Sequence, residues 1–289
     1  MTSIKRIGIV VNPKKKNALS VLKQLRRCLK SRNLKVVDDT LIDRKLIPLE
    51  SDLIIALGGD GTLLNIVHFM GRRSVPVLGI NLGSLGFLTE FTTQDFFICL
   101  KDVLNGKYEC SERMMLSARV MNKTNKVCQR FKALNDIVIT KGELSRITNL
   151  DVWVNDKYLT TYTCDGLIIS TPTGSTAHSL ASGGPIIHPG QDVFVITPIC
   201  PHTLSNRPLI LPAKSEIIIR GKKESKHLYL TADGQSGMDV KADETIRVRK
   251  FPGKLKLIVS PKSNYFRILS QKLKWGGQMK LPGLKAGVF

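Results

Sequence analysis

The sequence predicts an α/β N-terminal domain with a parallel sheet, followed by a β-rich, sandwich-like C-terminal domain. Two observations support this fold class. Over residues 1–105, short apolar segments alternate with amphipathic helical segments, which is typical of a parallel sheet covered by helices. Over residues 106–258, short alternating segments are separated by turn residues, which is typical of an antiparallel sandwich. The remaining residues, 259–289, show little pattern.

The elements of the first domain follow from apolar patterning. In the helix expected over residues 18–29, Leu22, Leu25 and Leu29 fall on one face. A capping-box-like spacing from Thr92 to Asp95 opens the last helix, and Asn105-Gly106 closes it. Strands are expected over residues 4–11, 35–37, 53–57 and 75–80, and a further helix over residues 62–70.

The second domain is predicted from period-two alternation. Turn residues such as Asn155-Asp156 and Ala232-Asp233-Gly234 separate the segments. Strands are expected over residues 116–121, 137–140, 152–154, 167–170, 193–197, 216–220, 228–230 and 245–249.

Bulk properties indicate a cytoplasmic globular protein. No apolar run approaches the ~18 residues that a membrane span needs, so we expect no membrane partner. The first apolar segment is cut off by Asn12-Pro13 and a lysine run, so it reads as a strand and not as a signal peptide. The 6 cysteines are scattered without a C-x-x-C pair, so neither a zinc site nor a disulfide framework is expected.

The formal net charge of +21 suits polyanionic partners such as nucleotides, nucleic acid or acidic membranes. Stacking on nucleic acid needs aromatic residues, yet these make up only 6% of the chain and no basic-aromatic stripe occurs. We therefore expect no nucleic-acid partner. A generally basic proteome explains the charge equally well.

The turn Gly58-Gly59-Asp60-Gly61-Thr62 lies between a predicted strand and a predicted helix. Glycines permit unusual backbone angles and close ligand approach, and the free N–H groups of a helix start favour phosphate. An aspartate there would repel phosphate unless it accepted a proton or faced a metal. A solvated turn is the alternative, but the flanking elements favour a ligand site at the carboxyl edge of the sheet, where the loop of residues 81–86 also falls.

A second dense cluster of polar residues lies within residues 165–185. Asp165-Gly166 leads into a strand, then into Ser170-Thr171-Pro172-Thr173-Gly174-Ser175-Thr176 and a predicted short helix. Hydroxyls and free N–H groups suit phosphate or ribose oxygens. A Ser/Thr helix cap is the alternative, but the four hydroxyls exceed what one cap requires, so we favour a ligand loop.

Three further polar positions are ambiguous from the residues alone. His178 is either a catalytic base or, more commonly for a lone histidine, a packing or surface residue. Asn135-Asp136 interrupts an apolar run and is either a hairpin turn or a pair that binds an adenine edge or ribose hydroxyls. Asp233-Gly234-Gln235 reads as an ordinary turn.

Taken together, these segments resemble the NAD kinase family, which phosphorylates NAD to NADP. The Gly-Gly-Asp-Gly-Thr turn alone is shared with diacylglycerol, sphingosine and phosphofructokinase enzymes. Asn135-Asp136, the loop after Asp165-Gly166, Gly183-Gly184-Pro185 and Asp233-Gly234-Gln235 follow in the family's order and narrow the resemblance. It covers nearly the whole chain.

The resemblance implies a fold, substrates and an assembly. Residues 1–105 would form the α/β nucleotide-binding domain and residues 106–258 the β-rich NAD-binding domain. Residues 259–289 would be a tail that packs back on the first domain. NAD and ATP would be the small-molecule substrates, and the enzyme would be a homodimer or homotetramer.

The resemblance also implies residue roles. Asp60 would accept the proton of the adenosine-ribose 2′-hydroxyl as that oxygen attacks the γ-phosphate of ATP, and Gly61 would give close backbone contact. Asp136 stands where Glu is commoner, and His178 where the family usually has Tyr. The substrate-contact positions would be Asn135, Asp136, Asp165, Thr176, Ala177, His178, Ser179, Leu180, Ala181 and Gln235, with Arg146 and Thr163 in looser motifs.

Mg²⁺ or another divalent metal would accompany ATP. This ion keeps several waters and bridges substrate phosphates, so no protein metal ligand is predicted. We interpret Lys14, Lys15 and Lys16 as a solvated lysine run, with neutralisation of ATP phosphates as the alternative.

Two rival functions remain. A lipid kinase would share the Gly-Gly-Asp-Gly-Thr turn and use the basic surface on acidic membranes, but it leaves residues 165–177 unexplained, and no amphipathic membrane helix stands out. A non-catalytic NAD(H)-binding regulator or a basic nucleic-acid-binding module belongs to a different class. The presence of Asp60 argues against the non-catalytic regulator and against the nucleic-acid-binding module.

Overall fold

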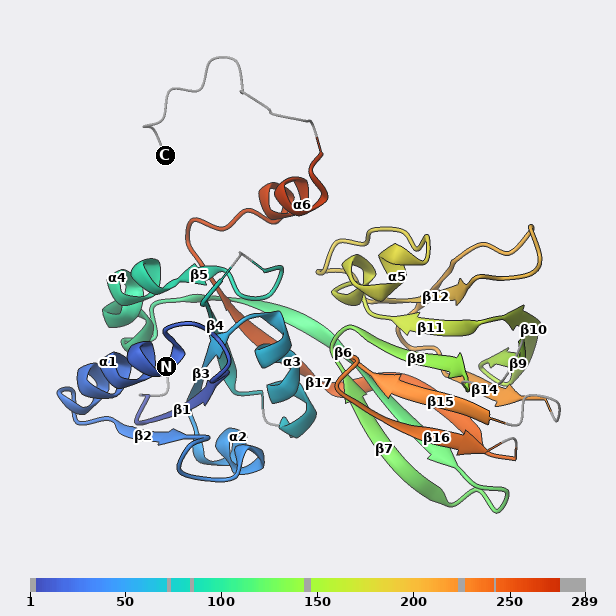
Figure 1. Cartoon of the computed structure of the whole chain (residues 1–289), viewed down its shortest axis with the longest axis horizontal. Coiled ribbons are helices and arrows are strands. Elements are labelled where there is room, and N and C mark those ends of the chain that lie inside the picture. The colour runs from blue at the N-terminus through green and yellow to red at the C-terminus, as the bar shows by residue number, and fades with distance from the viewer. Residues whose placement is uncertain are drawn as a thin grey trace.

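The structure is a computed structural model that describes residues 4–71, 74–83, 86–142, 147–222, 227–241 and 243–275. It has an α/β lobe built from the N-terminal part of the chain and a β-rich lobe built from most of the remainder (Figure 1). The predicted fold class is confirmed by this arrangement. None of the helices within the described ranges is both long and apolar enough to cross a lipid bilayer.

Parallel strands in the order β2–β1–β3–β4 form the centre of the α/β lobe. All six residues of β3 are buried, as expected for a strand covered on both faces. The strands are β1 Arg6–Val11, β2 Lys35–Asp38, β3 Leu53–Gly58, β4 Pro76–Asn81 and the short β5 Phe91–Thr92. The helices are α1 Ala18–Lys30, η1 Arg44–Leu46, α2 Ile47–Glu50, α3 Asp60–Phe69 and α4 Thr93–Leu104.

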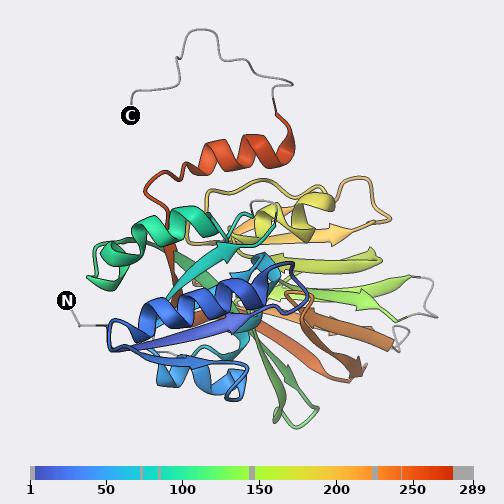
Figure 2. The ribbon, with the colours of Figure 1, turned by 60° about the vertical axis from the view of Figure 1, so that its left-hand side comes forward.

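Helices cover both faces of this sheet. The apolar sides of α1 and α4 pack with Ile7, Ile9 and Ile55 on one face, and Figure 2 shows these two helices on the same side of the lobe. On the other face, α2 and α3 pack with Val10 and Ile54. As the spacing predicts, Thr92 caps α4, and its hydroxyl accepts the Asp95 N–H at 3.1 Å.

The β-rich lobe is a sandwich of two layers. One layer is an antiparallel sheet in the order β13–β12–β11–β8–β15–β16. Its apolar side chains, such as Ile139 and Ile169, share one core with Val152 and Ile219 of the facing layer. The first layer contains β8 Asp136–Lys141, β11 Gly166–Ser170, β12 Val193–Ile199, β13 Leu209–Pro212, β15 His227–Ala232 and β16 Ser236–Lys241. The facing layer contains β6 Glu109–Met121, β7 Val127–Ala133, β9 Thr148–Val154, β10 Lys157–Cys164, β14 Ile217–Gly221 and β17 Thr245–Val259.

The long strand β17 belongs to both lobes. Its first part pairs antiparallel with β14, whereas Lys256 and Leu257 pair in parallel with β4. Between these parts the pairing with β6 is irregular, from Lys250 to Lys254. The strand order β10–β9–β14–β17–β4–β3–β1–β2 therefore runs as one sheet from the β-rich lobe into the α/β lobe.

Several elements escape the sequence pattern. The sequence does not predict β7, β10, β13 and β16. Of these, β7 lacks a clean alternation of burial, because it exposes three consecutive residues. The helix α6 (Tyr265–Leu273) is also missed, since Ile268 and Leu269 are its only buried residues. The helix predicted from residue 62 begins two residues earlier, at Asp60.

The segment before α6 contacts the α/β lobe. Lys262 pairs with Asp95 at 3.3 Å, and the Ser260 N–H donates to Glu90 at 3.2 Å. The ring of Tyr265 then packs edge-on against His188 of the β-rich lobe, with ring centroids 5.0 Å apart. Residues 276–289 of the predicted tail lie outside the described residues, and the domain boundaries after residues 105 and 258 stay predictions.

Because β17 joins the lobes, a cavity in its second half should weaken the whole molecule. Leu257 is fully buried, so we expect Leu257→Ala to lower the free energy of unfolding by about 2–5 kcal/mol in a denaturant titration. Leu204, which is 93% exposed, supplies the control: Leu204→Ala should change it by less than about 0.5 kcal/mol. Equal effects of the two substitutions would contradict the central place of β17.

Candidate functional site

Asp60 lies where β3 ends and α3 begins, and its carboxylate is held by a neighbouring loop. It accepts hydrogen bonds from the N–H groups of Phe87, Leu88 and Thr89 at 2.9, 3.1 and 3.1 Å and from the Thr89 hydroxyl at 3.0 Å. A Cβ at Gly86 would lie 2.0 Å from this carboxylate, so a larger residue there would displace it. These donors fix the orientation of the predicted proton acceptor.

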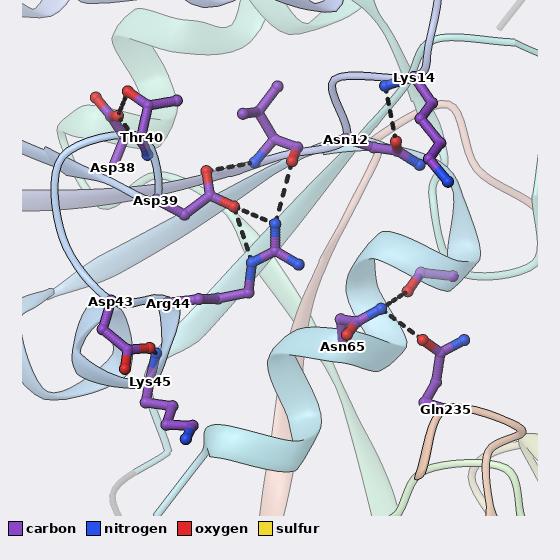
Figure 3. A network of polar contacts seen from close by, with 12 residues as sticks. Asn12, Lys14, Asp38, Asp39, Thr40, Asp43, Arg44, Lys45, Asn65 and Gln235 are labelled. Carbon is purple, nitrogen blue, oxygen red and sulfur yellow. Dashed lines mark hydrogen bonds and ion pairs between the residues drawn. The ribbon is translucent and has the colours of Figure 1, made fainter.

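The ends of β1 and β2 at this edge of the sheet also carry polar groups. Asn12 follows β1 directly, and its side chain accepts the Lys14 N–H at 3.1 Å. Lys14, Lys15 and Lys16 are exposed. After β2, Asp39 accepts the Val11 N–H at 3.0 Å and pairs with Arg44, which fixes the adjacent loop (Figure 3).

The pair Asn135-Asp136 lies at the start of β8, not in a hairpin turn. Asp233, from the turn between β15 and β16, accepts the N–H groups of Leu134, Asn135 and Asp136 at 2.8, 2.7 and 3.1 Å. In return, the Asp233 N–H donates to the Asp136 carbonyl at 3.0 Å. Asp233 reads from the sequence as part of an ordinary turn, because its hydrogen-bond partners lie almost one hundred residues away in the chain.

Asp136 and Asp233 form a buried carboxyl pair. They are 4% and 8% exposed. Burial, with the nearby charge of Asp233, raises the pKa of Asp136 to about 7, and burial raises the pKa of Asp233 to about 6. Three N–H donors favour the charged form of Asp233, so Asp136 is the member that retains a proton near neutral pH.

The hydroxyl-rich loop is held mainly by its own side chains. The Thr171 hydroxyl donates to the Leu134 carbonyl at 2.5 Å, Ser175 to the Pro172 carbonyl at 2.7 Å and Thr176 to the Thr173 carbonyl at 3.2 Å. The Thr171 N–H donates to the Asn135 carbonyl at 2.9 Å, and Gly174 lies so close that a Cβ would meet that oxygen at 2.1 Å. The loop is therefore built onto the Asn135-Asp136 segment.

The residues after this loop differ in exposure. They form the 3-10 turn η2 (Gly174–Thr176) and the short helix α5 (His178–Ala181). Ser179 is buried, and its hydroxyl lies 2.9 Å from that of Thr197. Thr176, Ala177 and Leu180 are half-buried, whereas His178 and Ala181 are exposed.

The two clusters predicted from sequence meet. Phe87 and Leu88, which Asp60 binds, line a small cavity together with Pro172, Thr173 and Thr176 of the hydroxyl loop. Between the lobes, the Asn65 amide of α3 donates to the Gln235 side chain at 2.5 Å and to the Gly61 carbonyl at 3.2 Å (Figure 3).

Other predicted positions lie elsewhere. Asp165, at the opposite end of β11 from Thr171, pairs with Lys141 at 2.6 Å, and the Thr163 hydroxyl donates to Asn149 at 2.7 Å. At ~3.3 Å per residue, the strand places Asp165 about 20 Å from Thr171. Arg146 lies outside the described residues.

A groove of about 460 Å³ lies beside Asn65 and Gln235, between α3 and strands of the β-rich lobe. It is basic, because Arg119, Arg130 and Lys132 line it, and none of the three forms an ion pair with a described carboxylate. Phe251 and Pro252 add apolar surface, and the Lys132 ammonium lies 5.3 Å from the Phe251 ring centre. The sequence did not indicate this groove, since its cations come from separate strands.

No group of three His, Cys, Asp or Glu side chains in the described part of the chain could hold a metal ion. The Asp60 carboxylate, which lies closest to the predicted phosphate site, is already occupied by N–H and O–H donors. The described residues therefore do not form a protein cage for a divalent cation.

Two family descriptions match the chain. The ATP-NAD kinase N-terminal domain matches residues 44–108, and the ATP-NAD kinase C-terminal domain matches residues 134–260. The NAD kinase of Syntrophotalea carbinolica is 45% identical over 284 residues, covering 94% of this chain and 99% of that protein. The NAD kinase of Geobacter metallireducens is 49% identical over 230 residues, covering 80% of this chain and 81% of that protein.

Solved structures are similar too. Yeast NADH kinase complexed with NADH is 26% identical and has a TM-score of 0.90, covering 97% of this chain and 90% of that one. The fold is also that of an NAD kinase from Archaeoglobus fulgidus in complex with ATP, at 24% identity and a TM-score of 0.76, covering 93% of this chain and 98% of that one.

The raised pKa of Asp136 predicts a pH dependence of stability. The native carboxyl holds its proton up to about pH 7, whereas the unfolded one loses it near 3.8, so this group costs stability as the pH rises through that window. Asp136→Asn removes the titration. Between about pH 5 and 7, the free energy of unfolding should fall less steeply with pH in the variant than in the wild type. The two slopes should differ by ~1 kcal/mol per pH unit.

Urea titrations at several pH values measure these slopes. Asp239→Asn, at an exposed position of β16, is the charge-matched control and should keep the wild-type slope. Parallel slopes for Asp136→Asn and the wild type would contradict a protonated Asp136.

Proposed function

Because the chain belongs to the NAD kinase family, we propose that it transfers the γ-phosphoryl group of ATP to the 2′-hydroxyl of the adenosine ribose of NAD, with Mg²⁺, and so forms NADP in the cytoplasm. The observation that carries this assignment is the meeting of the Asp60-bound residues Phe87 and Leu88 with Thr173 and Thr176 of the hydroxyl loop. The six free cysteines support a reducing compartment.

In this proposal the acceptor nucleotide lies between Asp60 and the segment Asn135-Asp136. The ribose 2′-hydroxyl replaces one of the four donors on the Asp60 carboxylate and gives up its proton as the oxygen attacks phosphorus. The protonated Asp136 can donate a hydrogen bond to the acceptor, whereas an ionised carboxylate only accepts. Further contacts to the acceptor come from Thr176, Ala177, His178, Leu180 and Ala181. The buried Ser179 holds this segment through its hydroxyl contact with Thr197.

We assign the donor nucleotide to the basic groove. Asn65 follows Asp60 by five residues, about 7.5 Å along the helix, so a triphosphate that begins in the groove can reach the start of α3. There, Gly61 permits close approach and the helix N-terminus favours negative charge. The cations Arg119 and Arg130 would neutralise phosphate charge, which is the main requirement of phosphoryl transfer.

Mg²⁺ in this scheme is carried by the ATP phosphates and water, and we assign it no protein ligand. When bound, it would supply positive charge to the transferred phosphoryl group. The described side chains bind, orient and deprotonate the acceptor.

A homo-oligomer accounts for the remaining predicted contacts. Thr163 and Asp165 lie at the far end of β11, about 20 Å from the hydroxyl loop, so one chain does not bring both ends to one dinucleotide. We propose that a second copy supplies its Thr163 and Asp165 in a homodimer or homotetramer.

A coupled assay tests the function. Purified protein with NAD, ATP and Mg²⁺ should produce NADP, detected with an NADP-specific dehydrogenase. Diacylglycerol or sphingosine as acceptor tests the lipid-kinase alternative, and NAD binding without turnover would indicate a regulator. If no NADP forms and the protein either phosphorylates a lipid acceptor or binds NAD without turnover, the proposed reaction is rejected.

Asp60→Asn tests the proton acceptor. A general base contributes typically ~10²–10⁴-fold to rate, so we expect kcat to fall by about that factor while NAD binding, measured calorimetrically, is retained. The control is Asp102→Asn, at an exposed site on α4, which should keep wild-type kcat. Near-normal turnover by Asp60→Asn would remove the carboxylate from the mechanism.

Neutralising the groove should weaken the donor specifically. For Arg119→Gln combined with Arg130→Gln, we expect the KM for ATP to rise at least tenfold, which corresponds to ~1.4 kcal/mol, with the KM for NAD nearly unchanged. Arg27→Gln, at an exposed position on α1, controls for loss of positive charge. A rise in the KM for NAD in place of ATP would move the donor out of the groove.

A further inference from the structure

The turn between β15 and β16 contacts both lobes at once. Asp233 and Gly234 at its centre have φ of 53° and 60°, the left-handed pair typical of a tight hairpin turn. Two residues apart, Asp233 and Gln235 direct their polar groups to different partners: Asp233 to residues 134–136 and Gln235 to Asn65 of α3. A short rigid turn therefore connects the start of β8 to the helix that begins with Asp60.

The Asp233 end of the turn holds the backbone of residues 134–136. Its Oδ1 accepts the N–H groups of Asn135 and Asp136, and its Oδ2 accepts that of Leu134. Three consecutive N–H groups donate to one buried carboxylate and so determine the path of this segment. If the segment turned away, each of these N–H groups would lose its hydrogen-bond acceptor. The carbonyls of Leu134 and Asn135 accept the hydroxyl and the N–H of Thr171, so both sides of the chain are held.

The Gln235 end of the turn contacts the α/β lobe. The Asn65 amide bridges the Gln235 side chain and the Gly61 carbonyl, which lies one residue after Asp60. Leu134 also packs in the same apolar cluster as Leu63 and Leu64 of α3. The contact thus acts on the first turns of the helix that carries the proposed proton acceptor.

We propose that the β15–β16 turn aligns the acceptor segment with Asp60, with Asp233 as a positioning residue that holds Asn135-Asp136 and the Asn65–Gln235 contact as the link to α3. This inference rests on the proposed function, because it concerns the geometry of the same site. It assigns Asp233 a role through Asn135-Asp136, without contact to the substrate.

The two ends of the turn should produce different kinetic signatures. In Asp233→Asn one acceptor oxygen becomes an NH₂ donor facing N–H groups, so the acceptor segment relaxes. We expect the KM for NAD to rise about tenfold with kcat within about threefold. In Asn65→Ala the segment keeps its shape but loses its link to α3, so kcat should fall about threefold or more while the KM for NAD stays within about twofold.

Hydrogen exchange of the backbone gives a readout independent of activity. The amides of residues 134–136 should exchange at least tenfold faster in Asp233→Asn than in the wild type. Asp239→Asn, exposed on β16, should leave both their exchange and the kinetics unchanged. Asn65→Ala, at a surface contact, retains every hydrogen bond of Asp233 and keeps the test decisive if Asp233→Asn fails to fold.

The outcomes separate this inference from the proposed function. If the wild type makes no NADP, the reaction is wrong, and the exchange of residues 134–136 still decides the role of Asp233. If the wild type is active and Asp233→Asn keeps both the wild-type KM and the wild-type exchange, the positioning role is wrong. The positioning role would also be overturned if Asp233→Asn and Asn65→Ala lost kcat and kcat/KM equally, in proportion to a lowered melting temperature.

Discussion

The arrangement of the molecule depends on the backbone pairing of one strand. β17 exchanges hydrogen bonds with β14 in the β-rich lobe and with β4 in the α/β lobe, so the two lobes share a sheet and are not merely tethered. Slipping a strand by one residue would move every side chain to the opposite face. The edge of the sheet that carries Asp60 is thereby held at a fixed place relative to β8 and β11, where the other polar residues of the site lie.

Within this shared-sheet arrangement, two side-chain carboxylates accept hydrogen bonds from backbone N–H groups. Asp60 binds three consecutive N–H groups of residues 87–89, and Asp233 binds those of residues 134–136. In each case a charged side chain from one segment determines the conformation of another segment distant in sequence. Hydrogen bonds to a charged group contribute more than neutral ones, so these two contacts add to the burial of Leu88 and Leu134 in holding the two segments.

How much the sequence could predict follows from the range of each interaction. The β3–α3 turn and the Thr92 cap depend on neighbouring residues, and both are found where the pattern indicated. The role of Asp233 depends on partners about one hundred residues away, and the basic groove combines α3 with residues of β6, β7, β16 and β17, so no local pattern reveals them. The edge strand β16 and the helix α6 were missed because each buries too little apolar surface to leave a periodic signal.

A site proposed to receive ATP has to tolerate three aspartates close to incoming phosphates. The structure reduces their effective charge in two ways. Asp60 accepts three N–H groups and one hydroxyl, and Asp233 accepts three N–H groups; the dipoles of these donors offset the negative charge. No described residue donates a hydrogen bond to the Asp136 carboxyl, and its burial beside Asp233 raises its pKa to about 7, which favours the neutral form. The cations Arg119, Arg130 and Lys132, which form no ion pair with a described carboxylate, lie on the groove side. In the proposed scheme, the resulting field would attract a polyphosphate to the groove and leave a carboxylate at the acceptor, where phosphoryl transfer requires a base.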